Sequence, residues 1–275
     1  MTAWANAEQA RRWNGDSGRY WIAHRERHLA AHRRLVPHLF AAAAISPGER
    51  VLDVGCGCGG TTIAAARVAD RALGLDLSGP MLQVARRLAA DAGAANASFA
   101  QGDAQACPLR PGCCDVMISS FGVMFFADPA VAFTNLAAAL RRRGRLAFLC
   151  WQPALDNELF AIPLRAFLAR TSRPGPADDS PFVDPRQVRG LLSAAGWEDI
   201  TIGSVREPAW IGSDVADVMG YVRDMRMVRN LAAGLGNETL AGQALADIAE
   251  QYAARQRLDG IWVQAAAWLV TARRP

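Results

Sequence analysis

The sequence predicts an α/β protein built on a doubly wound, mostly parallel sheet of seven strands. Between residues 50 and 151, short apolar runs of strand length alternate with alanine-rich stretches of helical length. Turn and capping residues separate the two kinds of segment. Strands and helices that alternate in this way form parallel sheets, because right-handed crossovers place the helices on both faces.

The first five predicted strands are short and mostly apolar, and they cover residues 50–54, 72–76, 98–102, 115–119 and 145–151. The helices between them carry recognisable end signals. Ser78 and Asp128 are predicted N-caps, and each is followed by a proline in the first helical turn. The helix after Asp128 is predicted to close at residues 141–144, where three arginines and a glycine follow one another.

After residue 151 the alternation is less regular. Residues 157–170 and 185–196 are predicted helices, with a proline-rich loop at 172–185 between them. Two further strands are predicted at 197–205 and 261–271. The second is apolar on both faces, so we expect it inside the sheet.

The pattern divides the chain into three parts. Residues 1–45 are a predicted N-terminal helical cap, 46–152 the ligand-binding core, and 153–275 the C-terminal part of that core. Within the last part, residues 209–259 hold two helical patterns between strands that should be neighbours. An insertion of this length is predicted to be a lid over the site.

Composition excludes several classes of function. All 30 basic residues are arginine, so Schiff-base chemistry, a phosphate-loop lysine and a Tyr-x-x-x-Lys site are excluded. The net charge of +4 is spread along the chain, and no nucleic-acid partner is expected. There is no apolar run of 18 residues and no signal-peptide pattern at the start. We therefore expect a cytoplasmic protein without stable membrane insertion.

No metal site is predicted. The six cysteines include no Cys-x-x-Cys pair, and buried or loop thiols are the expected state. A thiol site for a soft ligand such as arsenite remains an alternative. His24, His28 and His32 share one helical face, but no carboxylate lies on that face.

The most informative motif joins the first strand to the next helix, at residues 51–60: Val-Leu-Asp-Val-Gly-Cys-Gly-Cys-Gly-Gly. Glycines allow the backbone to pass close to a ligand. Asp53 can bind an ammonium group or polarise the loop, Asp76 can accept both hydroxyls of a ribose, and Asp103 can accept from an exocyclic amine. Because the carboxyl ends of parallel strands meet at one edge of the sheet, these residues predict a site for a nucleoside attached to an amino acid. The alternative is that they serve only turns and helix caps.

These residues resemble the class I S-adenosylmethionine-dependent methyltransferases over residues 50–151. The resemblance implies a Rossmann-like fold, S-adenosylmethionine as cofactor and S-adenosylhomocysteine as product. It places the methionine part of the cofactor at the glycine loop, the ribose at Asp76, and the adenine near the ends of the second and third strands. The cofactor-binding residues that it implies are Asp53, Gly55, Cys56, Gly57, Asp76, Leu77, Met81, Gly102, Asp103, Ala104 and Ser119.

Two further segments are similar to a bacterial subgroup close to the quinone-biosynthesis methyltransferases: Trp13-Asn14-x-x-x-Gly18-x-x-Trp21 and residues 121–126. The sequence departs from the family at residues 143–145, Arg-Gly-Arg in place of Pro-Gly-Gly, which should alter a turn before the fifth strand.

The acceptor is expected to be a small, partly apolar metabolite. The loop after the fourth strand is Ser-Ser-Phe-Gly, which differs from the Asn/Asp-Pro-Pro-aromatic loop of enzymes that methylate nucleic-acid bases. The predicted lining of the acceptor site is Trp21, Phe121, Met124, Phe125 and Trp151.

Methyl transfer from a sulfonium is an in-line displacement, so a base is needed only if the acceptor must lose a proton. His24 and His28 are the candidate bases. Transfer to oxygen, nitrogen or carbon and the oligomeric state stay open. The alternatives are a nicotinamide-dependent oxidoreductase, which also requires glycines and an acid about twenty residues later, and a catalytically silent cofactor-binding protein.

Overall fold

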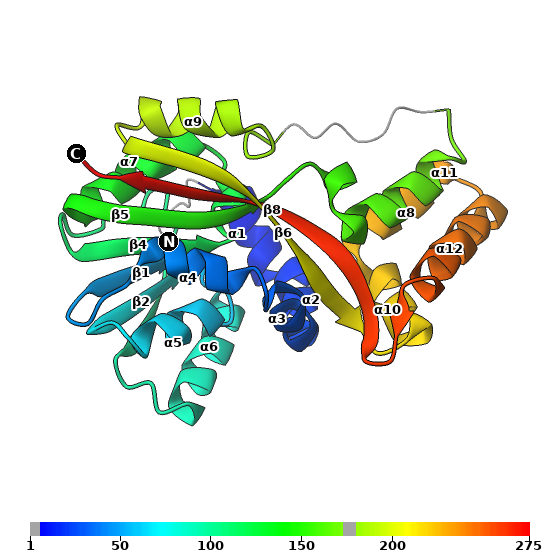
Figure 1. The fold of residues 1–275 in the computed structure, drawn as a ribbon, viewed down its shortest axis with the longest axis horizontal. Helices are drawn as coiled ribbons and strands as arrows, with labels where there is room; N and C mark the ends of the chain where they lie inside the picture. Colours follow the sequence, from blue (N-terminus) through cyan, green and yellow to red (C-terminus); the bar gives the residue numbers. More distant parts are fainter. Residues whose placement is uncertain (1–5, 173–179) are drawn as a thin grey trace.

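The computed structural model describes residues 6–172 and 180–275 and confirms the doubly wound α/β architecture (Figure 1). The strands follow the order β3-β2-β1-β4-β5-β8-β6, with the short β7 paired to β8 beside this path. β1 to β5 are parallel, and β8 runs antiparallel to both of its neighbours. The strands are Arg50–Val54 (β1), Arg71–Asp76 (β2), Ala97–Gln101 (β3), Cys114–Ser120 (β4), Leu140–Trp151 (β5), Glu198–Gly212 (β6), Gln256–Arg257 (β7) and Gly260–Arg273 (β8).

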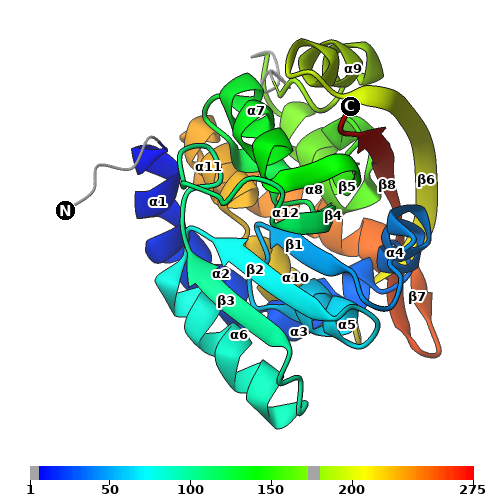
Figure 2. The same cartoon turned by 90° about the vertical axis from the view of Figure 1, so that its left-hand side faces the viewer.

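The helices fall into a cap, two layers and a helical cluster beyond the sheet (Figures 1 and 2). Those before β1 are α1 (Ala7–Asn14), α2 (Asp16–Ala23), α3 (Arg25–His32) and α4 (Val36–Ala43). Those of the core are α5 (Gly60–Ala66), α6 (Gly79–Asp91), α7 (Pro129–Ala139) and α9 (Pro185–Ala194). The cluster holds α8 (Glu158–Leu168), α10 (Val215–Asp224), α11 (Arg226–Leu235) and α12 (Glu238–Ala253).

The predicted capping residues start their helices. The Ser78 hydroxyl accepts from the amide of Met81 at 3.3 Å, and the Asp128 carboxylate accepts from the amide of Val131 at 3.0 Å. Asp184 does the same for α9, accepting from the amide of Arg186 at 2.8 Å. Each bond satisfies one of the amides that the first turn of a helix leaves unpaired.

Two apolar clusters cover the two faces of the sheet. On one face, Leu39 of α4 and Ala65 of α5 pack with Val51 and Ile118, and this cluster continues into the helices beyond the sheet. On the other face, Phe133 of α7 and residues of α9 pack with strand residues such as Leu52 and Phe148. The central strands β1 and β4 are therefore buried from both sides, as their apolar runs predict.

The end of α7 differs from the prediction. The helix stops at Ala139, and β5 begins at Leu140 instead of continuing as helix to residues 141–144. Cys114 pairs with Leu140 and Val116 with Arg145, so the residues between form a bulge in β5. The arginines reach carboxylates there: Arg141 Nε lies 2.9 Å from Asp115, and an Arg145 guanidinium nitrogen lies 2.6 Å from Glu49. Ion pairs of Arg141 and Arg145 beside the bulge, rather than a helix terminus, therefore account for two arginines of this basic segment.

The C-terminal part follows the predicted topology with longer strands. β8 lies between β5 and β6, inside the sheet as expected. β6 continues beyond the predicted residue 205 to Gly212, and residues 209–212 pair with the start of β8. Three helices, α10 to α12, follow where two helical patterns were predicted.

Some predicted segments lie in part outside the described residues: positions 1–5 of the cap and 173–179 of the proline-rich loop. Within the described ranges, no helix is both long and apolar enough to cross a membrane.

Candidate active site

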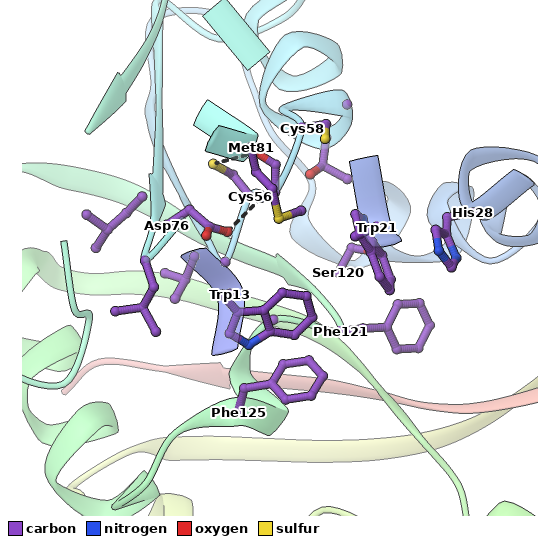
Figure 3. Close-up of a pocket in the computed structure, with 18 of the residues that line it drawn as sticks. Trp13, Trp21, His28, Cys56, Cys58, Asp76, Met81, Ser120, Phe121 and Phe125 are labelled. Atoms are coloured by element: carbon purple, nitrogen blue, oxygen red, sulfur yellow. Dashed lines mark hydrogen bonds between the residues drawn. The ribbon is translucent and has the colours of Figure 1, made fainter. Parts of the chain in front are cut away.

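A cavity of about 220 Å³ opens at the carboxyl ends of the parallel strands, under the cap helices (Figure 3). Its walls come from the loops after β1, β2, β3 and β4, from the end of β5, and from α1 to α3. The predicted residues that line it are Trp21, His28, Gly55, Cys56, Gly57, Asp76, Leu77, Met81, Gly102, Asp103, Ala104, Phe121, Phe125 and Trp151.

The glycine loop takes a conformation that few other residues adopt. Gly55, Gly57 and Gly59 have φ angles of +68°, +56° and +83°. A Cβ atom on Gly55 would lie 2.6 Å from the Cα of Gly122, so the loops after β1 and β4 touch through their backbones. A Cβ atom on Gly57 would lie 3.0 Å from the Met81 methyl group. The absence of these side chains leaves the loop backbone open to the cavity.

Asp76 at the end of β2 connects two loops. One carboxylate oxygen accepts from the amide of Gly57 and the other from the amide of Ser78, both at 2.8 Å. Burial raises the pKa of Asp76, and these amides partly oppose the rise. A carboxylate has about four lone-pair sites, so both oxygens can still accept further hydrogen bonds.

Asp103 after β3 faces the same cavity and is 5% exposed. Its carboxylate accepts from the amides of Asn6 and Gln105, at 2.8 and 3.0 Å. Asn6 also lines the cavity, and its side-chain nitrogen donates to the carbonyl of Phe125 at 3.0 Å. Its side-chain oxygen is buried and has no hydrogen-bond partner in the described structure. An unpaired hydrogen-bond acceptor, the side-chain oxygen of Asn6, therefore lies beside Asp103.

Aromatic rings form the apolar wall of the cavity. Trp13 contacts Phe125 edge-on, with ring centroids 4.9 Å apart, and lies 6.0 Å from Trp21. Phe121 stacks on Trp151 at 4.0 Å. Figure 3 shows Trp13 above Phe125, with Trp21 and His28 beside each other. Such a wall suits a flat, apolar ligand.

The three histidines occupy different environments. His24 lies at the junction of α2 and α3, outside the cavity lining, with its ring nitrogen 3.5 Å from the Asp224 carboxylate. His28 and His32 line the cavity. Burial, with His32, His24 and Arg27 nearby, lowers the pKa of His28 to about 3. Burial lowers the pKa of His32 to about 4. Both imidazoles are therefore neutral at physiological pH.

Four predicted residues lie outside the cavity lining: His24, Asp53, Ser119 and Met124. Asp53 is fully buried behind the glycine loop, where it accepts from the hydroxyls of Thr61 and Thr62, each at 2.6 Å. The Ser119 hydroxyl accepts from the amide of Gly122 at 3.1 Å and shapes the turn. Because β4 continues to Ser120, the alternation of the strand turns Ser120 toward the cavity instead.

Asn6, Arg25, His32 and Ser120 also line the cavity, although the sequence analysis did not assign them to the site. His32 had a usable signal in its spacing of four residues from His28, and Ser120 had one in its place in the loop after the fourth predicted strand.

The Trp13-Asn14 motif attaches the cap to the site. The Ser78 hydroxyl donates to the carbonyl of Trp13 at 2.8 Å, and the Asn14 amide donates to the carbonyl of Leu77 at 3.0 Å. A Cβ atom on Gly18 would lie 2.0 Å from the Trp13 carbonyl oxygen, which explains why the motif has glycine there. The cap is therefore bonded to the same loop that carries Asp76.

Within the described residues, no group of three or more histidine, cysteine, aspartate or glutamate side chains is arranged to hold a metal ion. All six cysteines are free thiols.

Comparisons with known proteins agree with this geometry. A methyltransferase-domain family matches residues 51–144. The protein Rv1405c of Mycobacterium tuberculosis is 36% identical over 117 residues, and aklanonic acid methyltransferase DauC of a Streptomyces species is 35% identical over 104 residues. These alignments span 42% of each chain for Rv1405c, and 37% of this chain and 47% of the relative for DauC.

The structure of YcgJ from Bacillus subtilis superposes with a TM-score of 0.59 at 18% identity, covering 88% of this chain and 99% of that one. This likeness extends the shared fold well beyond the aligned methyltransferase domain. The match over residues 51–144, together with the shared fold, supports a class I S-adenosylmethionine-dependent methyltransferase.

Proposed function

We propose that the chain transfers the methyl group of S-adenosylmethionine to an oxygen, nitrogen or carbon atom of a small, partly apolar metabolite. One observation carries the proposal: Asp76 and Asp103, from the ends of neighbouring strands, line one cavity together with the glycine loop. Both carboxylates bond to amides of their own turns, and both keep lone pairs free for a ligand in the cavity.

The described residues fit the cofactor. Asp76 would accept from the ribose hydroxyls, while Asp103 and the unpaired oxygen of Asn6 would accept from the adenine amine. Gly55, Cys56 and Gly57 would surround the methionine part. Arg25 of α3 also lines the cavity and would hold the carboxylate of that part.

When bound, the cofactor supplies a methyl group that is already activated on a sulfonium. The chain would then act mainly by alignment, and holding two reactants in line lowers a barrier by roughly 7–11 kcal/mol. The rings of Trp13, Trp21 and Phe125 would exclude water, which strengthens the electrostatic interactions within the site.

The relatives support a metabolite as acceptor. DauC is named for an acid that it methylates. The aromatic wall of this cavity also provides an apolar surface for a small acceptor.

Calorimetry with S-adenosylhomocysteine tests the cofactor site. We expect binding by the purified chain and a loss of at least about tenfold in affinity for Asp76→Ala, because the ribose would lose a charged acceptor. Asp91→Ala is the control, since this exposed side chain at the end of α6 lies away from the cavity. Equal affinity in the wild type and Asp76→Ala would refute the proposed site.

Turnover separates the enzyme from its catalytically silent alternative. Transfer of labelled methyl from S-adenosylmethionine to any member of a panel of aromatic and aliphatic metabolites supports the proposal. Cofactor binding without transfer across the panel favours the silent protein.

A further inference from the structure

A second, smaller cavity of about 20 Å³ lies behind the aromatic wall. His28, His32 and Trp151 line both cavities, so they form the partition between the two spaces. The smaller cavity holds about one water molecule or one polar atom, and it has no room for a ring. A flat molecule in the large cavity could therefore reach it only with a small substituent.

The partition is built from rings whose faces are already occupied. His28 stacks on Trp21 at 3.8 Å with an angle of 8° between the planes. His32 lies 4.7 Å from Phe121 and 5.5 Å from Trp151. With one face of its ring covered by Trp21, His28 offers a ligand the nitrogen atoms at the edge of the ring.

One of those nitrogens is unpaired. His28 is 8% exposed, and its Nε2 atom is buried without a hydrogen-bond partner in the described structure. Arg27 lines the smaller cavity, and its Nε atom is likewise buried and unpaired. The rest of the Arg27 guanidinium donates to the carbonyl of Ile211 and the carboxylate of Asp217. Unpaired buried groups of this kind are rare and costly, which points to a ligand atom that completes them.

The charge around the partition defines the chemistry of that atom. Among the described residues that line the smaller cavity, Arg27 carries the formal charge and no carboxylate is present. In the view of Figure 3, Asp76 is drawn away from His28, with Trp21 between them. An ammonium group would meet the Arg27 guanidinium and no carboxylate in the lining, because the Asp217 carboxylate is already paired with Arg27. A hydroxyl oxygen can instead accept from Arg27 and either donate to His28 Nε2 or accept from it, and a carbonyl oxygen can accept from both when Nε2 carries the proton.

The next inference rests on the proposed function. We propose that the methyl acceptor is a flat aromatic or enolic compound, and that His28 and Arg27 bind its hydroxyl or carbonyl oxygen at the partition. Its ring lies against Trp21, Phe121 and Trp151 in the large cavity, and its oxygen reaches the smaller one. His28 is thus a specificity-determining residue, which selects oxygen-bearing acceptors over amines.

Binding of three naphthalene probes tests this assignment. Calorimetry uses the full chain saturated with S-adenosylhomocysteine, titrated with 2-naphthol, naphthalene and 2-naphthylmethylamine. We expect 2-naphthol to bind about tenfold more tightly than naphthalene, the effect of one buried hydrogen bond to an otherwise unpaired group. The amine should bind no more tightly than naphthalene. Tighter binding of the amine than of 2-naphthol would overturn the inference.

His28→Phe keeps the ring that stacks on Trp21 and removes its nitrogens. We expect the preference for 2-naphthol over naphthalene to fall to within about twofold, with the affinity for S-adenosylhomocysteine unchanged. The control is His24→Phe, one turn earlier and outside both cavity linings, which should keep the preference. A preference that survives in His28→Phe would contradict the role of His28.

Two outcomes separate this inference from the proposed function. A chain that fails to bind S-adenosylhomocysteine refutes the function itself. A chain that binds it but does not distinguish 2-naphthol from naphthalene refutes only the acceptor class. This comparison uses the wild-type chain, so its outcome does not depend on the folding of a variant.

Discussion

At the scale of single residues, Asp53 shows the cost of enclosing a carboxyl group. Its side chain is fully buried, one oxygen accepts from two threonine hydroxyls, and the other has no partner in the described structure. Burial raises its pKa to about 6, although the hydroxyls of Thr61 and Thr62 favour the ionised form. Asp53 therefore organises the start of α5, but its ionisation in a buried position lowers the free energy of unfolding.

This lowering of the free energy of unfolding should depend on pH. A carboxyl group whose folded pKa is raised contributes its full stability below the unfolded pKa near 4, and that contribution is lost as the pH rises through about 6. Asp53→Asn removes the ionisation. We expect the free energy of unfolding of the variant, relative to the wild type, to increase by roughly 1–1.5 kcal/mol between pH 5 and pH 8.

Urea denaturation at the two pH values measures the difference. Asp91→Asn, at an exposed position, should stay within about 0.5 kcal/mol of the wild type at both. A difference for Asp53→Asn that does not change with pH would show that this residue is ionised to the same extent in the folded and unfolded states.

Residues differ in how far the sequence predicts their place. Asp76 and Asp103 could be predicted as partners because strand ends of a parallel sheet meet at one edge. Ser120 rather than Ser119 lines the cavity because β4 runs one residue past its predicted end, and neighbouring side chains of a strand point to opposite faces. Asn6 could not be predicted, because its position depends on a fold-dependent contact with Asp103 across 97 residues.

At the scale of elements, the signals for the starts of helices are reliable, and the signal for the end of α7 is not. Ser78 and Asp128 start their helices as predicted, and Asp184 starts α9 in the same way, because a cap bonds to amides two or three residues away. The end of α7 was wrong because Asp115 and Glu49, distant in sequence, bind the arginines that resemble a helix terminus. Local chemistry alone does not distinguish these two uses of arginine.

The attachment of the cap to the loop after β2 gives a prediction for an element. Asn14 donates to the carbonyl of Leu77 and accepts from the amide of Gly79, both at 3.0 Å, and it is not part of the cavity lining. Asn14→Ala should weaken S-adenosylhomocysteine binding by roughly fivefold, because about 1 kcal/mol of cap attachment is lost.

Calorimetry measures this effect, with Arg11→Ala on the exposed side of the same helix as the control. If both variants bind like the wild type, the cap does not contribute to the cofactor site through this contact.

At the scale of the whole molecule, Arg27 connects the cap to the distal helices. From α3 it donates to the Ile211 carbonyl at the end of β6 and to the Asp217 carboxylate of α10. Its side chain is 15% exposed, and its guanidinium also lies over the ring of Tyr221, 4.9 Å from the centroid. One side chain thus joins three elements around the smaller cavity.

Arg27→Ala should lower the free energy of unfolding by about 1–3 kcal/mol, since the carbonyl of the buried Ile211 loses its donor and the partly exposed Asp217 carboxylate loses its ion-pair partner. It should also speed amide hydrogen exchange in residues 215–224, measured by mass spectrometry. Arg19→Ala, which breaks an exposed pair with Asp16, should change the free energy of unfolding by less than about 1 kcal/mol. Unchanged exchange in residues 215–224 would show that α10 is held without Arg27.

The central position of β8 has a consequence for how the chain reaches its folded state. β6 pairs with no parallel strand of the described sheet and joins it only through β8. During synthesis, β5 therefore keeps an unpaired edge until residues 260–273 have left the ribosome. β1 to β5 can assemble earlier, but their sheet stays open to aggregation until this late segment inserts.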